Sequence, residues 1–166
     1  MLAGMVLVLG LVAGGGQARA EDTGACAKFK WSIDREAKLF SAGPSRLASG
    51  GTFSLENGAA AVDLQPADTV AFAVPPERKP AAGSFGAVLQ MASAPEAKLY
   101  EITLSGEAWI DVIQDGKPVK SGAFSGQEGC PGVRKSVRFP LAAKPTVVQV
   151  SNAKAATINL AILPAQ

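Results

Sequence analysis

The chain reads LYEITLSGEAWIDVIQDG from Leu99 to Gly116, and this stretch decides the fold class. Apolar residues occupy every second position of two runs, which is typical of β-strands with one buried face. They are Tyr100, Ile102 and Leu104 in the first run, and Ala108, Ile110 and Val112 in the second. Ser105-Gly106 separates the runs and Asp115-Gly116 ends the second, as turn residues do. The stretch therefore predicts two successive strands.

The same alternation continues on both sides of this stretch. Further predicted strands lie at Phe53–Leu55, Val62–Leu64, Val70–Val74, Phe85–Met91, Val137–Leu141, Val148–Val150 and Ile158–Ile162. Asn57-Gly58 predicts a tight hairpin between the first two of these. About eight to ten short strands separated by glycine, proline and Asx turns predict an all-β fold. We expect a single antiparallel β-sandwich of jelly-roll type.

One short helix is expected before the strands begin. Ser32 is a suitable N-cap, and Ile33, Ala37 and Phe40 share one face of a helix. Gly43-Pro44 follows and ends it.

The first 20 residues predict a secretory signal peptide. An apolar run from Leu2 to Ala13 is shorter than the roughly 20 residues that a membrane-spanning helix needs. Ala18-Arg19-Ala20 then supplies an A-x-A cleavage pattern. We expect a signal at 1–20, an N-terminal segment with the helix at 21–50, and strands at 51–166, the last two forming one domain. The predicted location is the periplasm or the exterior, with no membrane insertion after cleavage.

Cys26 and Cys130 are the only cysteines. In an oxidising compartment such a pair is expected to form a disulfide. Closing a loop of about 100 residues stabilises a fold by up to about 4–5 kcal/mol in the chain-entropy model. Two free thiols or an intermolecular bridge are the alternatives.

Composition excludes several classes of function. The chain has no histidine, which removes Ser-His-Asp and Cys-His nucleophile systems and the usual zinc and haem ligand. We therefore predict no cofactor, no metal site and no catalytic residue. The net charge of +2 gives no electrostatic case for nucleic acid. The basic stretch formed by Arg134, Lys135 and Arg138 lies on a predicted strand and is interpreted as a solvated face.

Three residues of the central stretch are the candidate ligand-binding side chains. Trp109 falls opposite Ile110 and Val112, so its ring either stacks on a sugar or docks a partner, or is covered by the N-terminal segment and Trp31. Glu107 and Asp111 lie on the same outward side of the strand as Trp109. A pair of carboxylates is also what a glycoside hydrolase requires.

The Leu99–Gly116 stretch, together with Pro145–Leu163, resembles the pre-peptidase C-terminal type of bacterial β-sandwich domain. The resemblance rests on the strand led by Tyr100, the Ser-Gly turn, the strand ending at Asp115-Gly116 and a final pair of strands, and it covers residues 97–166. It implies a jelly-roll-like accessory domain of exported proteins, often tied to surfaces or polysaccharides. This sequence differs from that family in that no protease or other catalytic domain accompanies the resembling region.

The whole chain also resembles small exported proteins of alphaproteobacterial type, some of which carry the label homogentisate 1,2-dioxygenase. A non-haem iron dioxygenase of that kind needs two histidines and a carboxylate. The chain has no histidine, so the chemistry does not support that activity.

Taken together, the sequence favours a non-catalytic exported domain that binds an envelope protein or a polysaccharide. A carboxylate-dependent glycoside hydrolase and a structural envelope protein without a ligand are the alternatives. The sequence leaves the oligomeric state open.

Overall fold

The computed structural model describes residues 24–166, so the predicted signal at 1–20 lies outside the described part. One 3-10 turn, one α-helix and twelve strands make up this part. Their bounds are η1 Cys26–Lys28, α1 Asp34–Ser41, β1 Arg46–Ala48, β2 Thr52–Phe53, β3 Ala59–Asp63, β4 Gln65–Pro66, β5 Phe85–Met91, β6 Lys98–Leu104, β7 Trp109–Gln114, β8 Lys117–Pro118, β9 Ala123–Gly126, β10 Lys135–Leu141, β11 Thr146–Ala153 and β12 Thr157–Pro164. The prediction of an all-β fold with one short helix is confirmed.

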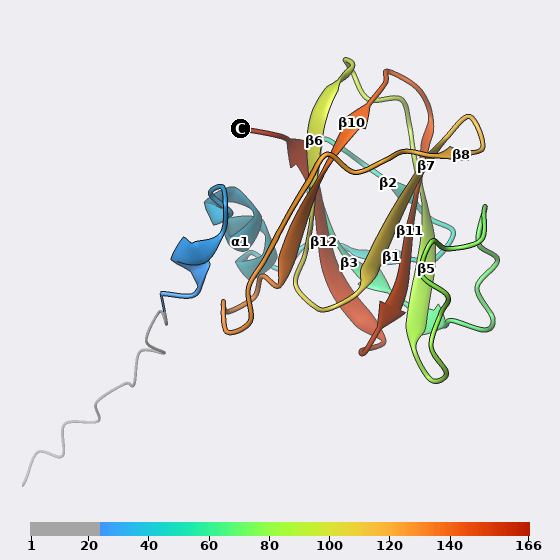
Figure 1. The fold of residues 1–166 in the computed structure, drawn as a ribbon, viewed down its shortest axis with the longest axis horizontal. Helices are drawn as coiled ribbons and strands as arrows, with labels where there is room; N and C mark the ends of the chain where they lie inside the picture. The colour runs from blue at the N-terminus through green and yellow to red at the C-terminus, as the bar shows by residue number, and fades with distance from the viewer. Residues whose placement is uncertain (1–23) are drawn as a thin grey trace, which may run out of the picture.

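The strands form two sheets that lie as two layers, with α1 against the outer side of one of them (Figure 1). Sheet A has the order β1-β3-β12-β6-β10-β9, and sheet B has the order β2-β5-β11-β7-β8, with β4 also on β5. Most neighbouring strands are antiparallel, but β1 pairs with β3 and β2 with β5 in parallel. The expectation of antiparallel sheets throughout is therefore wrong at these two pairs.

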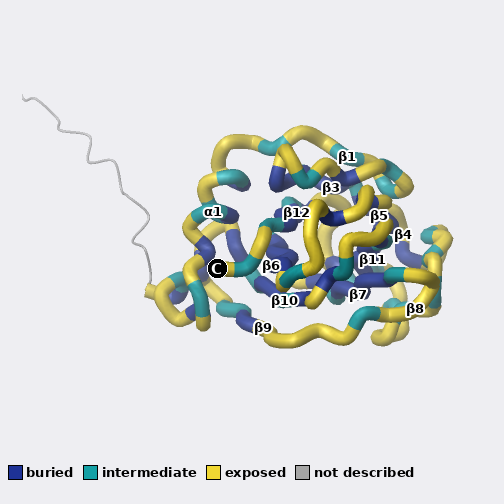
Figure 2. The backbone as a smooth tube through the Cα atoms, turned by 90° about the horizontal axis from the view of Figure 1, so that it is seen from above, coloured by how far each residue is buried: buried dark blue, intermediate teal, exposed yellow. Residues whose placement is uncertain are grey.

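One apolar core fills the space between the sheets. It contains the inward residues of β6, β10 and β12 from sheet A and of β5, β7 and β11 from sheet B, and these strands are the buried centre of Figure 2. Ile102, Leu104 and Val148 are fully buried. Burying each such side chain stabilises the fold by about 1.5–3 kcal/mol relative to exposure.

Two local predictions are wrong. The Asn57-Gly58 turn does not close a hairpin, because β2 belongs to sheet B and β3 to sheet A. The predicted strand at Val70–Val74 is an irregular segment instead. Its backbone bonds to a side chain: Gln149 of β11 accepts from the Val74 N–H and donates to the Val74 carbonyl, both at 3.1 Å. The segment therefore lies on the outer face of sheet B.

The helix and the disulfide cover the outer face of sheet A. The predicted helix is confirmed at Asp34–Ser41, but its N-cap is Ile33 and not Ser32, and no side-chain hydrogen bond caps it. Ser32 Oγ instead accepts from the Asp34 N–H, at 3.2 Å. Ile33 and Phe40 are buried with Ala161 of β12 in a second apolar cluster. Cys26 and Cys130, 104 positions apart, are joined by the predicted disulfide at the edge of this cluster.

A buried charge cluster also ties the helix to sheet A. Glu101 of β6 accepts from Arg138 Nε at 2.9 Å and Nη2 at 2.6 Å, and from Arg35 Nη2 at 3.3 Å. Arg138 also lies over the Trp31 ring, 4.1 Å from its centroid. Trp31 thus packs on sheet A and does not cover Trp109, so that expectation is wrong. Arg138 is a structural residue and not part of a solvated face.

Candidate functional site

A pocket of about 750 Å³ opens at one edge of the two layers. We call it the β7 pocket, because β7 forms its floor. Strand β10 of sheet A, the segment 118–124 and the loop at Glu77-Arg78 form its walls. In Figure 2 the exposed segment between β8 and β9 runs along this edge. The pocket thus lies where sheet A and sheet B come apart.

Strand β7 contributes side chains from both of its faces. Ile110 and Val112 belong to the core between the sheets, whereas Trp109 and Asp111 point to the outer face of sheet B. The pocket reaches both faces because β8 is only two residues long and covers the far end of β7. The short hairpin follows from the Asp-Gly turn after β7, whose two residues have φ angles of 50° and 69°. Positive φ at both positions is what a type I′ turn needs.

Trp109 is half-buried and holds two cations at the pocket. Arg78 lies 4.5 Å and Lys135 5.4 Å from the centroid of its ring. Its indole N–H donates to Asp111 Oδ1 at 3.1 Å. The ring is covered in part by these cations, and not by the N-terminal segment. Each such cation–π contact stabilises a partly exposed site by about 0.5–1 kcal/mol.

Lys135 is the central cation of the pocket. Its Nζ donates to the Ala108 carbonyl oxygen at 2.7 Å and lies 5.5 Å from the centroid of the Phe124 ring. Burial lowers the pKa of Lys135, and the nearby positive charges of Arg134 and Arg78 lower it further. The interpretation of Lys135 as part of a solvated face is therefore wrong. Phe124 is 52% exposed, a large apolar side chain left at the pocket mouth.

The two candidate carboxylates have different surroundings. Glu107 is exposed and precedes β7, and its hydrogen bond from Lys154 Nζ at 2.9 Å lowers the pKa of its carboxyl. Asp111 is buried, and burial raises the pKa of its carboxyl despite the hydrogen bond from Trp109. A hydrogen bond from the Glu77 backbone also lowers the pKa of Asp111, and the charge of Glu77 raises it. Asp111 is therefore not the solvent-facing residue that the alternation indicated.

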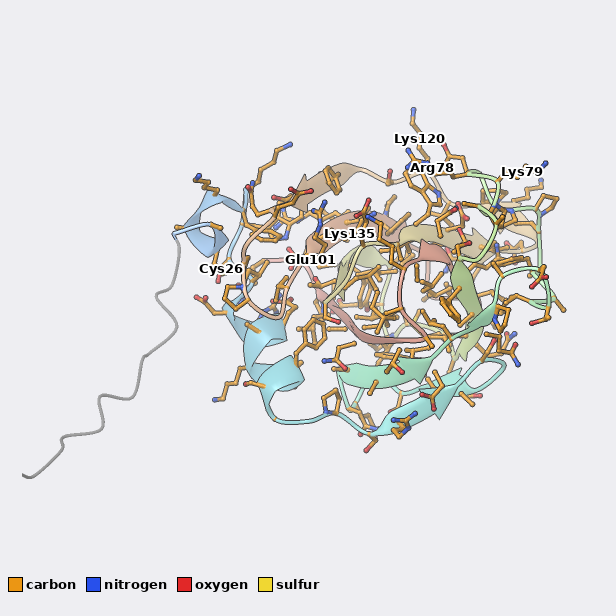
Figure 3. All side chains as sticks on the ribbon, turned by 90° about the horizontal axis from the view of Figure 1, so that it is seen from below. Cys26, Arg78, Lys79, Glu101, Lys120 and Lys135 are labelled. Carbon is orange, nitrogen blue, oxygen red and sulfur yellow. A yellow bond between two sulfur atoms is a disulfide. The ribbon has the colours of Figure 1, made fainter. Side chains whose placement is uncertain are left out.

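The free charge at the pocket is positive. Arg78 and Lys120 come from different segments and both line the pocket (Figure 3), and in the described part of the chain neither forms an ion pair. Among the acidic residues that line the pocket, Glu107 is neutralised by Lys154, and the raised pKa of Asp111 disfavours its ionised form. Glu77 also lines the pocket and forms no ion pair within residues 24–166, but the cations Arg78, Lys120 and Lys135 outnumber it. The pocket is thus suited to a ligand with negative charge.

The loop that carries Arg78 is held by β11. Asn152 Oδ1 accepts from the Ala81 N–H at 2.8 Å, and its Nδ2 donates to the Arg78 carbonyl at 3.2 Å. Gln149 fixes the same loop at Val74. These bonds place a proline-rich loop, which the sequence marks only as irregular, over Trp109.

Sequence reasoning named Trp109, Glu107 and Asp111, and all three line the β7 pocket. It missed Arg78, Lys135 and Phe124. Of these three, only Phe124 has a sequence feature that could have identified it. It is a large aromatic residue directly after the turn-rich stretch Lys120-Ser121-Gly122. Within residues 24–166 no group of three or more acidic or cysteine side chains is placed to hold a metal ion, and no helix there has the length and apolar character needed to cross a membrane.

No protein-family model, curated protein or solved structure matches the chain.

Proposed function

We propose that this chain is a non-catalytic exported domain that binds an envelope protein or a polysaccharide in the β7 pocket. The observation that supports the proposal most directly is the pocket itself, with a half-buried Trp109 and two cations, Arg78 and Lys120, that form no ion pair within residues 24–166. Pockets that combine an apolar wall with a few convergent polar groups are the usual ligand sites of proteins.

The proposed location is the periplasm or the exterior of the cell. The disulfide between Cys26 and Cys130 supports it, since such bridges persist in oxidising compartments. The predicted signal at 1–20 supports it as well. The two-layered all-β fold supports assignment to the jelly-roll type, the architecture that the resemblance at residues 97–166 implies.

Blocking the pocket mouth tests the proposal. Ser121→Trp adds a bulky ring at an exposed wall position, and Ser54→Trp adds the same ring next to β2, at the opposite edge of sheet B. Residues 21–166 of each form are applied to a glycan array and to a displayed library of random peptides. We expect wild type and Ser54→Trp to retain the same ligands and Ser121→Trp to lose them. Absence of any ligand up to high micromolar concentration would favour a purely structural envelope protein.

A carboxylate-dependent glycoside hydrolase is the second candidate, and one observation favours it. Asp111 and Glu107 line the same pocket, and their pKa values are displaced in opposite directions, upward by burial for Asp111 and downward by Lys154 for Glu107. One protonated acid and one ionised carboxylate is the pair such enzymes use. The test is release of reducing ends from any polysaccharide that the domain binds. Turnover that is unchanged in Glu107→Gln or in Asp111→Asn rules this reaction out.

A further inference from the structure

The backbone of β7 presents an unpaired edge to the pocket. Val112 accepts a hydrogen bond from the Val119 N–H at 2.7 Å, on the side away from β11. Successive residues of a strand direct their N–H and C=O groups to alternate sides, so Ala108, Ile110 and Val112 all point to this side. Strand β8 pairs only with Ile113 and Gln114. Among the strands of residues 24–166, none pairs with the edge of β7 between Ala108 and Val112.

Only some of the backbone N–H and C=O groups on this edge have a hydrogen-bond partner. The Ala108 carbonyl accepts from Lys135 Nζ at 2.7 Å, and the Val112 carbonyl accepts from Val119. Within residues 24–166, no hydrogen bond is formed on this side by the N–H of Val112 or by the N–H and C=O of Ile110. Free donors and acceptors in this spacing match the backbone of another extended chain.

The surroundings of the edge differ on its two sides. Toward the core lie apolar side chains, Val137 and Phe139 of β10 and the exposed Phe124 of β9. Toward the outer face of sheet B lies Arg78 above Trp109. An added strand alternates its side chains between these two sides. Its inward residues would meet an apolar wall that carries Lys135 at the Ala108 end, and its outward residues would meet Arg78.

We propose that the β7 pocket takes an extended segment of a partner protein in which apolar and acidic residues alternate, paired as an added strand with β7 at Ile110. This inference rests on the proposed binding function and names the class of ligand. Backbone hydrogen bonds supply the attachment, the apolar wall selects every second side chain, and Arg78 and Lys120 select the acidic ones. A polysaccharide offers hydroxyl groups without the regular donor and acceptor spacing of a strand, so the edge favours the peptide.

Four capped hexapeptides serve as probes. The first alternates valine with glutamate, and the second has lysine in place of glutamate. The third and fourth are the first with N-methyl groups on the valine amides or on the glutamate amides, so that one of them blocks the amides that pair with β7. Calorimetry gives the affinity, and the backbone amide resonances of the 21–166 protein show where each peptide binds. We expect the valine–glutamate peptide to shift the Ile110 and Val112 amides and to protect them from hydrogen exchange. Lysine for glutamate or N-methylation in the pairing register should weaken binding by about tenfold or more, equivalent to about 1.4 kcal/mol.

Matched variants identify the cations. Arg78→Glu and Lys120→Glu should each weaken binding of the valine–glutamate peptide. Lys79→Glu, next to Arg78 but outside the lining of the pocket, should leave its affinity unchanged (Figure 3). The inference is wrong if no peptide moves the Ile110 amide, or if N-methylation has no effect in either register. Binding of a glycan that Ser121→Trp abolishes would then retain the proposed function while excluding the added strand. Absence of both kinds of ligand would remove both.

Discussion

The ammonium group of Lys135 in β10 lies 2.7 Å from the carbonyl oxygen of Ala108, just before β7, and so connects sheet A to sheet B across the pocket. The contact places a cation in a partly buried position, and burial lowers the pKa of Lys135 below its usual 10.5. A lowered lysine pKa means that folding disfavours the charged form. The charged form of Lys135 therefore lowers the free energy of unfolding. This loss of stability is complete below the folded-state pKa of Lys135 and disappears as the pH rises toward the unfolded-state pKa.

We therefore predict that wild type gains stability relative to Lys135→Met as the pH rises from neutral toward 10.5. Each unit of pKa displacement corresponds to about 1.4 kcal/mol. Urea denaturation of both proteins across this pH range measures the difference. Lys117→Met, at an exposed position of β8, is the control. Parallel stability curves for wild type and Lys135→Met would contradict the buried placement of Lys135.

Glu36 gives a prediction on the acid side. Its side chain is fully buried, and burial raises the pKa of its carboxyl above 4.5, with the charge and hydrogen bond of Glu101 adding to the effect. Because the folded-state pKa is raised, protonated Glu36 makes its full contribution to the free energy of unfolding below pH 4.5. This contribution is lost as the pH rises through the folded-state pKa. Glu36→Gln, which does not ionise, should lack this loss.

The measurement is the free energy of unfolding between about pH 4 and 7. Wild type should become less stable relative to Glu36→Gln as the pH rises, by about 1.4 kcal/mol for each unit of pKa displacement. Glu56→Gln at an exposed turn serves as the control. A constant difference between wild type and Glu36→Gln at all pH values would show that Glu36 ionises as it does in the unfolded chain.

The disulfide gives a prediction on overall stability. Cys26→Ser with Cys130→Ser should lower the free energy of unfolding by up to about 4–5 kcal/mol, because the bridge closes a long loop in the unfolded chain. Urea denaturation measures this loss, and fully reduced wild type should match the double variant. Equal midpoints for untreated wild type and the double variant would contradict a stabilising bridge in the purified protein.

Gly86 of β5 gives a prediction on packing. A Cβ atom there would lie 2.7 Å from the Val150 carbonyl oxygen and 3.1 Å from Phe72 Cζ. Gly86→Ala should therefore destabilise the protein by about 1–3 kcal/mol, as overpacking of a core does. Gly122→Ala is the matched control, since its Cβ would have no neighbour nearer than 3.8 Å. A thermal midpoint of Gly86→Ala within error of wild type would contradict the close approach of β5 and β11.

Regular strands and the disulfide could be predicted because local alternation and the single cysteine pair encode them. The pairing of β2 could not, because the alternation of Phe53 and Leu55 is the same whichever sheet the strand joins. The segment Val70–Val74 alternates like a strand but bonds to the side chain of Gln149, a partner that is distant in sequence.

For the site, sequence reasoning found the residues that are chemically unusual and missed those whose role depends on distant neighbours. Trp109 and Asp111 were identified on one strand. Arg78 and Lys135 look like any surface cations until the fold places both over the Trp109 ring. The burial of Glu36 has the same origin, because it lies on the face of α1 that packs against sheet A.

The most direct measurement uses the two tryptophans. Trp31→Phe leaves Trp109 as the only indole, so the emission then reports on the β7 pocket alone. Titration of this variant with the valine–glutamate hexapeptide should change the emission of Trp109 with saturation, and the peptide that is N-methylated in the pairing register should need about tenfold more for the same change. Emission that stays constant while calorimetry detects binding would place the ligand elsewhere and contradict a ligand site on β7.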